Sequence, residues 1–396
     1  MLKVKHNRVI IIGGTTDIYK YANIRGLEIL SIQKKDNLNK SMMKLSEKTF
    51  VLDYRDIQKT LEFVLTISSI YPIDSVLSFT EDAQEITAIL NETMGLPGIP
   101  SKITRLVNDK SMMRDLLRDF SPIKSRLVST ESELSSFIEE SGLPVILKPK
   151  DGVGSIGIKL ITSYEYINQF KSEMLVEEYL VGPEYSVESF SFNGDHRVFS
   201  ITEKHVNNTR FVEEAHLVPA KLSMDKQKDI INFVVSFLNK IKLFDGPAHT
   251  EIILTENGPK VVETHTRPGG DYIPELVDLS CKVNMYELAI NWFTMNEKLD
   301  NDININYQGA AIKYLKFKPG KVEQVLGLAE ASQFRDVIRL ELNLNNGDFI
   351  KPVLKSADRR GYIIAIGKDS AEAYQTCVKA EKLLKIIYAV DQEELL

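Results

Sequence analysis

Apolar runs and amphipathic stretches alternate along the first hundred residues. Runs such as Val-Ile-Ile-Ile at 9–12 have the length and β-branched content of buried strands, and the stretches between such runs repeat their apolar positions with helical spacing. Strands that alternate with helices predict a parallel sheet covered on both faces. The expected elements are strands at 9–12, 27–33, 49–52 and 75–79 and helices at 56–69 and 81–94.

The rest of the chain continues as a long mixed segment and then a β-rich end. Glycine and proline cluster at 95–100, which predicts the end of the first unit. Near residue 301 short strand patterns around Gly-containing turns begin, and 370–387 is expected to close the chain as a helix. We therefore expect units at 1–100, 101–300 and 301–396, the middle one divided into 101–180 and 181–300.

Further elements are expected from the same two periodicities. Helical spacing covers 108–120, 225–240 and 284–294, and in the last of these Met285 and Trp292 are expected to be core residues. Strand patterns occur at 145–150, 174–180, 185–192, 309–317, 320–325, 337–344 and 362–367. The predicted class is α/β, or α+β overall, with a parallel N-terminal unit.

The composition of the chain limits the kinds of protein it can be. The chain has 396 residues, 43% of them apolar, and a net charge of −6, which argues for a soluble protein of several domains and against a nucleic-acid binder. The two cysteines, Cys281 and Cys377, have no metal or redox spacing, so a reducing compartment is expected. No signal-peptide core or membrane span is evident, and we expect a cytoplasmic location.

Candidate chemistry is densest at 249–271. A hairpin with its loop at 255–259 places Glu251 opposite Glu263, with Cβ atoms roughly 5 Å apart. Two carboxylates that close repel unless a cation lies between them, and Mg²⁺ is the natural occupant. The alternative is a surface hairpin with two solvated glutamates. Arg267 and then Gly269-Gly270 follow, a fixed cation and pliable backbone suited to a charged intermediate.

Two other stretches are candidate nucleotide contacts. Lys148 ends a strand, and the glycine-rich segment 152–157 follows. The backbone N–H groups of this segment can surround phosphate oxygens. A plain hairpin loop, the alternative, would have the same sequence pattern. The strand at 174–180 enters a Gly-Pro connector whose backbone can pair with a purine while Glu184 holds a ribose; an ordinary turn is the alternative. Gly13-Gly14 lacks the dinucleotide fingerprint and is expected to be a substrate-lining or structural turn.

The order of these features resembles the ATP-grasp superfamily over nearly the whole chain. The matching pieces are Gly95-Leu96-Pro97-Gly98, Asp109-Lys110, Lys148-Pro149 with its glycine loop, 177–184, and Glu251 with Glu263-x-x-x-Arg267. Arg267-Pro-Gly-Gly-Asp, preceded by Glu214-Ala-His216, looks most like bacterial L-amino-acid ligases that make dipeptides, and among them like the arginine-selective ligase of the rhizocticin type. The sequence departs from the superfamily at His265, where asparagine is frequent.

The resemblance implies roles for particular residues. At the nucleotide end the implied roles are neutralisation of the ATP phosphates by Lys110 and Lys148, and contact with the ribose by Glu184. The loop over the phosphates contains Gly152, Gly154, Ser155 and Gly157. The segment beside adenine contains Glu177, Glu178, Tyr179 and Leu180. The metal ligands implied are Glu251 and Glu263, with His265 left open. The residues implied at the reacting groups and the amino-acid pocket are Arg267, Gly269, Gly270, Lys148, Glu214 and His216.

The activity implied is ATP-dependent joining of two L-amino acids through an acyl phosphate, with release of ADP and phosphate. ATP and two Mg²⁺ ions, which Mn²⁺ can replace, are the implied cofactors. L-arginine is the implied N-terminal substrate, with Glu81, Asp82, Glu85 and Glu203 as unranked candidates to hold its side chain. A homodimer is implied, with no nucleic-acid or membrane partner. Two alternatives remain: an ATP-grasp carboxylase or glycine ligase of the purine type, and an ATP-binding regulator without catalysis.

Overall fold

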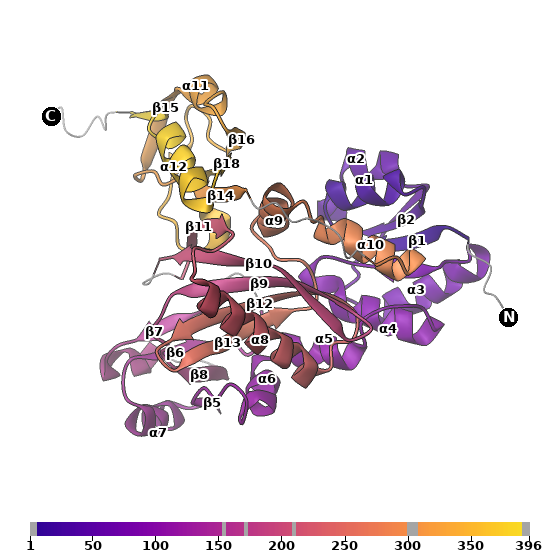
Figure 1. Ribbon diagram of the computed structural model, residues 1–396, viewed down its shortest axis with the longest axis horizontal. Helices are drawn as coiled ribbons and strands as arrows, with labels where there is room; N and C mark the ends of the chain where they lie inside the picture. Colours follow the sequence, from indigo (N-terminus) through magenta and orange to yellow (C-terminus); the bar gives the residue numbers. More distant parts are fainter. Residues whose placement is uncertain (1–5, 153–155, 170–172, 208–210, 299–307, 390–396) are drawn as a thin grey trace.

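The computed structural model describes residues 6–152, 156–169, 173–207, 211–298 and 308–389 (Figure 1). Four parallel strands in the order β3-β2-β1-β4 form the N-terminal sheet, as the alternating pattern predicted. The elements of this unit are β1 (Arg8–Ile12), α1 (Thr16–Ile24), β2 (Glu28–Gln33), η1 (Lys35–Asn37), α2 (Lys40–Leu45), β3 (Lys48–Val51), α3 (Ile57–Ile70), β4 (Ser75–Leu77), η2 (Glu81–Ala83) and α4 (Gln84–Met94).

The apolar run of β1 is continuous because both faces of the sheet are buried. Val9 and Ile11 belong to one hydrophobic cluster, and Ile10 and Ile12 belong to another. The first cluster also contains residues of α10 (Met285–Met295), which lies beside α1 in Figure 1 and is the expected core helix, with Met285 and Trp292 buried. A later part of the chain thereby covers one face of the N-terminal sheet.

The helix expected at 108–120 is interrupted at Asp109. The chain forms α5 (Ser101–Asn108) and α6 (Lys110–Leu117), and Asp109 between them has extended backbone angles, φ −101° and ψ 104°. Its carboxylate accepts hydrogen bonds from the backbone N–H groups of Ser111 and Met112, so it caps α6. The interruption makes Lys110 the first residue of a helix rather than a mid-helix residue.

A small sheet in the order β5-β8-β6-β7 follows and forms its own layer at the lower left of Figure 1. Its core is an apolar cluster that includes Val128, Leu134, Val145 and Val176. The elements are β5 (Ser125–Val128), α7 (Glu131–Ser141), β6 (Val145–Lys148), β7 (Lys159–Ile161), η3 (Tyr164–Gln169) and β8 (Met174–Glu178).

An eight-stranded sheet in the order β13-β12-β9-β10-β11-β14-β18-β16 joins the middle and C-terminal parts of the chain. Its first five strands in that order come from the middle of the chain and β14, β18 and β16 continue it, because β11 pairs antiparallel with β14. The elements from the middle are β9 (Glu184–Phe192), β10 (Asp195–Val206), β11 (Glu213–Val218), α8 (Met224–Ile241), β12 (Gly246–Thr255), β13 (Gly258–His265) and α9 (Ile273–Cys281).

The C-terminal part covers its end of this sheet with α12 (Ser370–Glu381), whose Ala373 and Cys377 pack in a cluster with β14 and β18. The predicted helix through 387 ends at Glu381, since Lys385–Tyr388 forms β19 and pairs with β15. The remaining elements are β14 (Gly309–Tyr314), β15 (Gly320–Leu326), α11 (Leu328–Ser332), β16 (Val337–Leu342), β17 (Phe349–Ile350), η4 (Ser356–Asp358) and β18 (Gly361–Gly367). Within the described ranges, no helix has the length and apolar character needed to cross a membrane.

The hairpin of β12 and β13 has the predicted facing glutamates but a different turn. Thr255 pairs with Gly258, so the connection is two residues long rather than the expected loop of 255–259. A register shift between Glu251 and Ile252 then places Glu251 opposite Glu263. A β-bulge adds one residue to one strand, and here it compensates for the shorter turn.

Candidate active site

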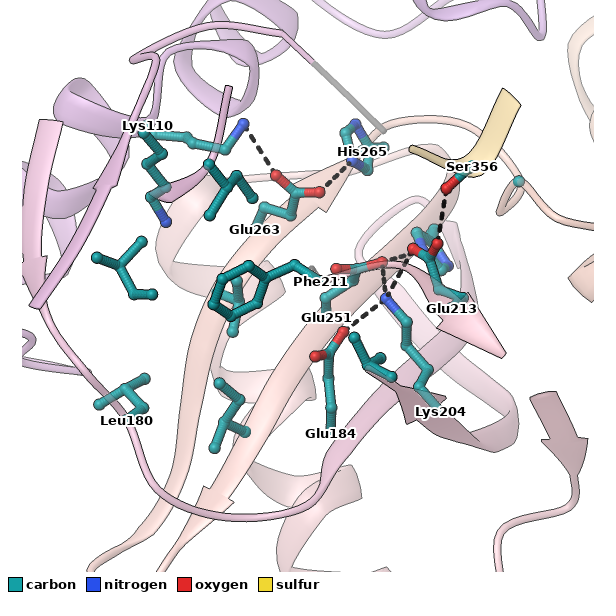
Figure 2. Close-up of a pocket in the computed structure, with 18 of the residues that line it drawn as sticks. Lys110, Leu180, Glu184, Lys204, Phe211, Glu213, Glu251, Glu263, His265 and Ser356 are labelled. Carbon is teal, nitrogen blue, oxygen red and sulfur yellow. Dashed lines mark hydrogen bonds and ion pairs between the residues drawn. The ribbon is translucent and has the colours of Figure 1, made fainter. Parts of the chain in front are cut away.

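A cavity of about 720 Å³ lies where the small sheet, the hairpin and the C-terminal part meet (Figure 2). Most of the residues selected from the sequence line it. They are Lys110, Lys148, Gly152, Glu177, Glu178, Tyr179, Leu180, Glu184, His216, Glu251, Glu263, His265, Arg267 and Gly270. Gly157, Gly269 and Glu214 are not among the lining residues, and Gly154 and Ser155 lie outside the part of the chain that the structure describes.

Lys148, at the end of β6, is held in the cavity wall by a buried carboxylate. Its Nζ lies 2.7 Å from Glu177 Oε2, and Arg114 Nε lies 2.6 Å from Glu177 Oε1. Burial alone would raise the pKa of Glu177, but Arg114 and Lys148 outweigh it and lower that pKa to about 2. Burial also lowers the pKa of Lys148 against the opposing effect of Glu177. The Glu177 side chain therefore anchors Lys148. Only the backbone of Glu177 is then free to meet a ligand.

Apolar side chains line the same end of the cavity. Ile146, Ile158 and Ile253 line it. Leu180, which follows the end of β8, lines it as well (Figure 2). Flat apolar walls beside a strand end provide van der Waals contact for an aromatic ring and backbone groups for its polar edge. This end of the cavity suits a purine.

Lys110 connects the start of the glycine-rich loop to the hairpin. Its Nζ donates to the Gly152 carbonyl oxygen at 2.9 Å and lies 2.9 Å from Glu263 Oε2. Gly152 has φ +102° and Gly157 has φ +81°, so both occupy the left-handed region that glycine tolerates without strain. A Cβ on Gly157 would also approach Pro149 to 3.0 Å. The conformation of this loop thus depends on its glycines.

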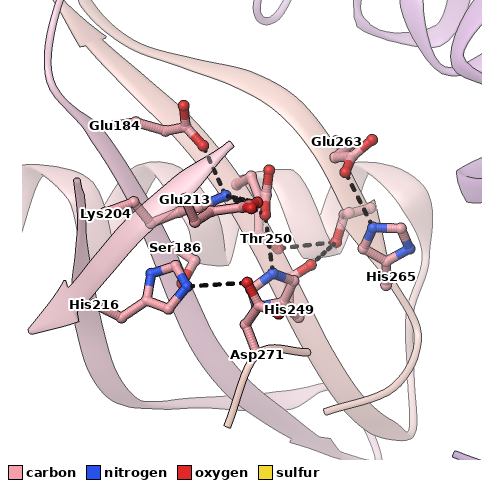
Figure 3. Close-up of polar contacts among 12 residues, drawn as sticks. Glu184, Ser186, Lys204, Glu213, His216, His249, Thr250, Glu263, His265 and Asp271 are labelled. Atoms are coloured by element: carbon pink, nitrogen blue, oxygen red, sulfur yellow. Dashed lines mark hydrogen bonds and ion pairs between the residues drawn. The ribbon is translucent and has the colours of Figure 1, made fainter. Parts of the chain in front are cut away.

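Lys204 on β10 is the cation at the centre of the carboxylate cluster (Figures 2 and 3). Its Nζ lies 2.5 Å from Glu251 Oε1 and 2.7 Å from Glu184 Oε1, with Glu213 at 4.0 Å. Burial would lower the pKa of Lys204, but the three carboxylates outweigh it and raise that pKa well above the usual value. Lys204 was not predicted from the sequence because the strand β10 was not recognised. The alternation of Thr202-Glu203-Lys204 would have indicated a strand with Lys204 on the same face as Thr202.

The two hairpin glutamates are suitable ligands for a magnesium–nucleotide complex. Each carboxylate has a lysine beside it, Lys204 at Glu251 and Lys110 at Glu263. Among the described residues, no three His, Cys, Asp or Glu side chains form a ready metal cluster. Mg²⁺ is usually held by one or two carboxylates plus substrate phosphates rather than by an all-protein cage. The donor set therefore fits an ion that arrives with the nucleotide.

Arg267 and His265 are held by a carboxylate from the N-terminal unit. Glu81, in η2, lies 2.6 Å from Arg267 Nε and 3.1 Å from His265 Nδ1. Burial would raise the pKa of Glu81, but His265 and Arg267 outweigh it and lower that pKa to about 2. Gly269 lies close behind, and a Cβ there would approach His249 Nδ1 to 2.8 Å. Only glycine fits at this approach.

The end of the cavity that was expected to hold the amino acid differs from the sequence expectation at one residue. A register shift in β11 pairs Val206 with Glu213 and His205 with Ala215, so Glu214 occupies a bulge. Glu213 consequently lines the cavity together with His216, whereas the Glu214 carboxylate pairs with Lys316 at 2.5 Å. The family resemblance implied Glu214 and His216 for the pocket, and the bulge at Glu214 instead leaves Glu213 at the cavity wall with His216.

Residues from the C-terminal part complete this end. Ser356 Oγ donates to Glu213 Oε2 at 2.9 Å, and Arg359 forms two hydrogen bonds with Asp271 at 2.9 and 2.7 Å. His216 Nε2 lies 3.5 Å from Asp271 Oδ2, while its buried Nδ1 has no hydrogen-bond partner among the described residues. Neither Ser356 nor Arg359 carried a sequence motif, since their contacts join distant parts of the chain.

The candidate partners for an arginine side chain all contact basic side chains of the protein. Glu81 binds Arg267, and Asp82 lies 2.5 Å from Lys34 Nζ. The other two pairs are Glu85 with Arg105 at 2.6 Å and Glu203 with His205 at 2.8 Å. None of the four is therefore an available carboxylate in this structure.

Two segments of the chain match known domain families. Residues 163–275 match the ATP-grasp domain, and residues 313–389 match L-amino acid ligase C-terminal domain 2. The first segment contains Glu251, Glu263 and Arg267, whereas Lys110 and Lys148 precede it. The second contains Ser356 and Arg359.

Named relatives and a solved structure are similar to the chain. Alanine–anticapsin ligase of Bacillus subtilis is 26% identical over 255 residues, 55% of this chain and 54% of that protein. The L-arginine-specific L-amino acid ligase of Bacillus subtilis is 20% identical over 320 residues, 75% of this chain and 76% of that protein. The crystal structure of an L-amino acid ligase from Bacillus licheniformis has a TM-score of 0.86 at 22% identity and covers 98% of this chain and 100% of that one.

The fold is thus the ATP-grasp fold that the order of motifs predicted. The chain spans less than two thirds of the length of several curated relatives, 54% in the case of the anticapsin ligase.

Proposed function

We propose that this chain, an ATP-grasp protein with an L-amino acid ligase C-terminal domain, joins two L-amino acids into a dipeptide at the expense of ATP. The observation that carries the proposal is the alignment of complementary groups along one cavity. The residues that line it include Lys148 and Lys110, the carboxylates Glu251 and Glu263, and Arg267 with Glu213. Figure 2 shows Lys110 beside Glu263 and Glu213 beside Lys204. The nucleotide phosphates would meet the lysines, the reacting phosphoryl group would lie near the two glutamates, and the amino acid would meet Glu213.

The chemistry that these groups serve begins with a carboxylate, which is a poor electrophile. A carboxylate oxygen of the first amino acid attacks the γ-phosphorus of ATP, the bond to ADP breaks, and an acyl phosphate forms. The amine of the second amino acid then attacks the acyl carbon, phosphate leaves with its electron pair, and the ammonium loses a proton. Charge on the transferred phosphoryl oxygens is stabilised by positioned cations.

Side chains at the cavity supply the positive charge that stabilises the phosphoryl oxygens and hold it in position. Lys110 and Lys148 would neutralise phosphate oxygens, and Arg267, held by Glu81, would meet the transferred phosphoryl group and the tetrahedral oxygen. Backbone N–H groups at Gly269 and Gly270 are proposed to share the second task. Glu251 and Glu263 would hold Mg²⁺, two ions in the full proposal, and the metal would supply further neutralisation of the phosphates.

The first amino acid is proposed to bind between Glu213 and His216. Glu213 is a carboxylate at the cavity wall that can accept from an ammonium, and the buried His216 Nδ1 has an unused hydrogen-bonding capacity. Holding the ammonium orients this substrate and discourages its use as nucleophile. Because Glu213 lines the cavity and Glu214 does not, the role expected for Glu214 passes to its neighbour.

L-arginine is the finer proposal for the N-terminal substrate. Its support is the relative named for L-arginine. A homodimer and a reducing, cytoplasmic setting belong to the same proposal; the two cysteines are free and buried.

The test is ADP release with each of the twenty amino acids alone and in pairs, followed by mass analysis of the product. The proposal predicts ADP formation that requires amino acids and a product with the mass of a dipeptide. ATP binding without ADP formation under every condition would instead indicate a regulator, and ADP formation that depends on bicarbonate or a ribosylamine would indicate a purine-type enzyme.

A further inference from the structure

The hairpin carries the same three residue types in mirror order on its two strands. β12 contains His249-Thr250-Glu251 and β13 contains Glu263-Thr264-His265, and the register places each residue opposite its like. The two threonine hydroxyls are 2.9 Å apart on one face, so both imidazoles and both carboxylates share the other (Figure 3). The imidazole centroids are 6.0 Å apart and the rings are 21° from parallel.

His265 lies between two carboxylates. Its Nε2 is 3.3 Å from Glu263 Oε1, and its Nδ1 is 3.1 Å from Glu81 Oε2. Imidazoles that bind metals almost always have their second nitrogen against a carboxylate, a carbonyl or water, which fixes the tautomer and the direction of the ring. Glu81 stands in that relation to His265, and Nε2 is presented to the same space as the Glu263 carboxylate.

His249 has the same surroundings but is more firmly bonded. Its Nδ1 donates to Glu188 Oε1 at 2.8 Å, and its Nε2 is hydrogen-bonded to Glu251 Oε1 at 3.2 Å. For His265 the contact of Nδ1 with Glu81 lacks hydrogen-bond geometry, and this nitrogen has no hydrogen-bond partner among the residues described. His249 is therefore held by hydrogen bonds at both nitrogens, whereas His265 is hydrogen-bonded only at Nε2, to Glu263 Oε1.

We propose that His265 Nε2 is a ligand of the divalent ion at Glu263, an inference that rests on the proposed function. Glu81 is the positioning residue for this imidazole. The site consequently prefers Mn²⁺ to Mg²⁺. Mg²⁺ favours an all-oxygen shell. An imidazole nitrogen shifts the preference toward first-row transition ions, because they bind nitrogen ligands more strongly than Mg²⁺ does.

Lys110 is the group that must move for such an ion to bind. Its Nζ lies 2.9 Å from Glu263 Oε2, and its side chain is 10% exposed. The phosphates of a bound nucleotide would offer this ammonium a new partner and leave the carboxylate to the metal. Metal binding at His265 should therefore depend on nucleotide.

The experiment is pulsed EPR of Mn²⁺ with a non-hydrolysable ATP analogue, on the full chain and without amino acids. The wild type should show the ¹⁴N coupling of a directly bound imidazole. His265→Asn should lose this coupling, and the matched variant His249→Asn should retain it. Circular dichroism of each variant confirms that the fold is kept.

Competition between Mn²⁺ and Mg²⁺ gives the second readout. The ratio of Mn²⁺ to Mg²⁺ affinity should fall about tenfold or more in His265→Asn, and Glu81→Gln should weaken Mn²⁺ binding by roughly 10- to 100-fold. Nucleotide-dependent Mn²⁺ binding without ¹⁴N coupling in the wild type, or an unchanged affinity ratio in His265→Asn, would overturn this inference alone. Absence of any nucleotide-dependent binding would overturn it together with the proposed function.

Discussion

Glu81 Oε2 lies 2.6 Å from Arg267 Nε, although the two residues are 186 positions apart in the chain. Glu81 comes from η2 of the N-terminal unit and Arg267 follows the hairpin strand β13. The N-terminal unit therefore holds the side chain that we place at the transferred phosphoryl group. A residue with this role should affect turnover far more than stability.

Replacement of Arg267 by alanine should lower kcat by roughly two to three orders of magnitude, the usual scale for losing one partner of transition-state charge. Glu81 retains His265 as a partner at 3.1 Å, so the fold should persist. The measurement is steady-state ADP release, with Arg118→Ala as the control because the Arg118 side chain is 77% exposed. Comparable kcat values in the two variants would refute the role of Arg267.

Glu251→Gln should abolish ADP release at millimolar Mg²⁺, because an amide removes the anionic ligand from the hairpin. Glu256 lies in the turn of the same hairpin and is exposed, so Glu256→Gln is the matched control. Titration with Mg²⁺ distinguishes weaker metal binding from a general loss of activity. Normal ADP release by Glu251→Gln at ordinary Mg²⁺ concentrations would contradict the assignment.

Lys204→Ala should destabilise the protein by about 3–5 kcal/mol, the cost of removing one partner of a buried ion pair. The variant removes the ammonium that lies within 2.7 Å of both Glu184 and Glu251, and leaves Glu251 with the His249 imidazole as its nearest partner. Urea denaturation measures the effect, and exposed Lys228 on α8 provides the control substitution. Equal midpoints for the two variants would show that Lys204 does not compensate the carboxylates.

Glu213 and Glu214 offer a paired test of the amino-acid pocket. Glu213→Ala should raise KM for the first amino acid by about tenfold or more, since a charge-assisted hydrogen bond contributes roughly 1.5–3 kcal/mol. Glu214→Ala removes an ion pair with Lys316, whose side chain is 59% exposed, and should change KM little. Initial rates against amino-acid concentration measure both values, and the reverse order would restore the pocket role to Glu214.

Acid should weaken the anchoring of Lys148. The pKa of Glu177 is lowered from 4.5 to about 2 in the folded protein, because Arg114 and Lys148 outweigh the effect of burial. A lowered carboxylate pKa contributes stability that is fully present above about pH 4.5 and is lost as the pH falls toward 2, up to about 3 kcal/mol. The difference in urea midpoint between wild type and Glu177→Gln should therefore shrink from pH 7 to pH 3. A difference that is constant over this range would contradict the pairing.

The sequence predicted the parts of the fold that follow from local pattern. Continuous apolar runs such as 9–12 indicated strands buried on both faces, and the two faces of β1 do lie in different clusters. The pairing of Glu251 with Glu263 was also correct, though for a different turn, since a register shift compensates for the two-residue connection. The helix expected to 387 was too long because pairing of β19 with β15 is not a local property.

The less predictable parts of the site depend on contacts between distant segments. The bulge in β11 that leaves Glu213 at the cavity wall does not change the hydropathy pattern, and the family resemblance had selected Glu214 instead. Ser356 lines the cavity, and Glu81 and Arg359 contact its lining residues Arg267 and Asp271, from two distant segments with no shared motif. Lys204 was closer to prediction, because recognition of β10 would have placed it inward beside Thr202.

The central claim is that a carboxylate of one amino acid becomes an acyl phosphate before the amide bond forms. The most direct measurement is turnover with an amino acid labelled with ¹⁸O in its carboxylate, followed by mass analysis of the released phosphate. The account predicts one ¹⁸O atom in each phosphate molecule, transferred from the carboxylate, together with a dipeptide product. Phosphate without label, formed alongside a dipeptide, would contradict it.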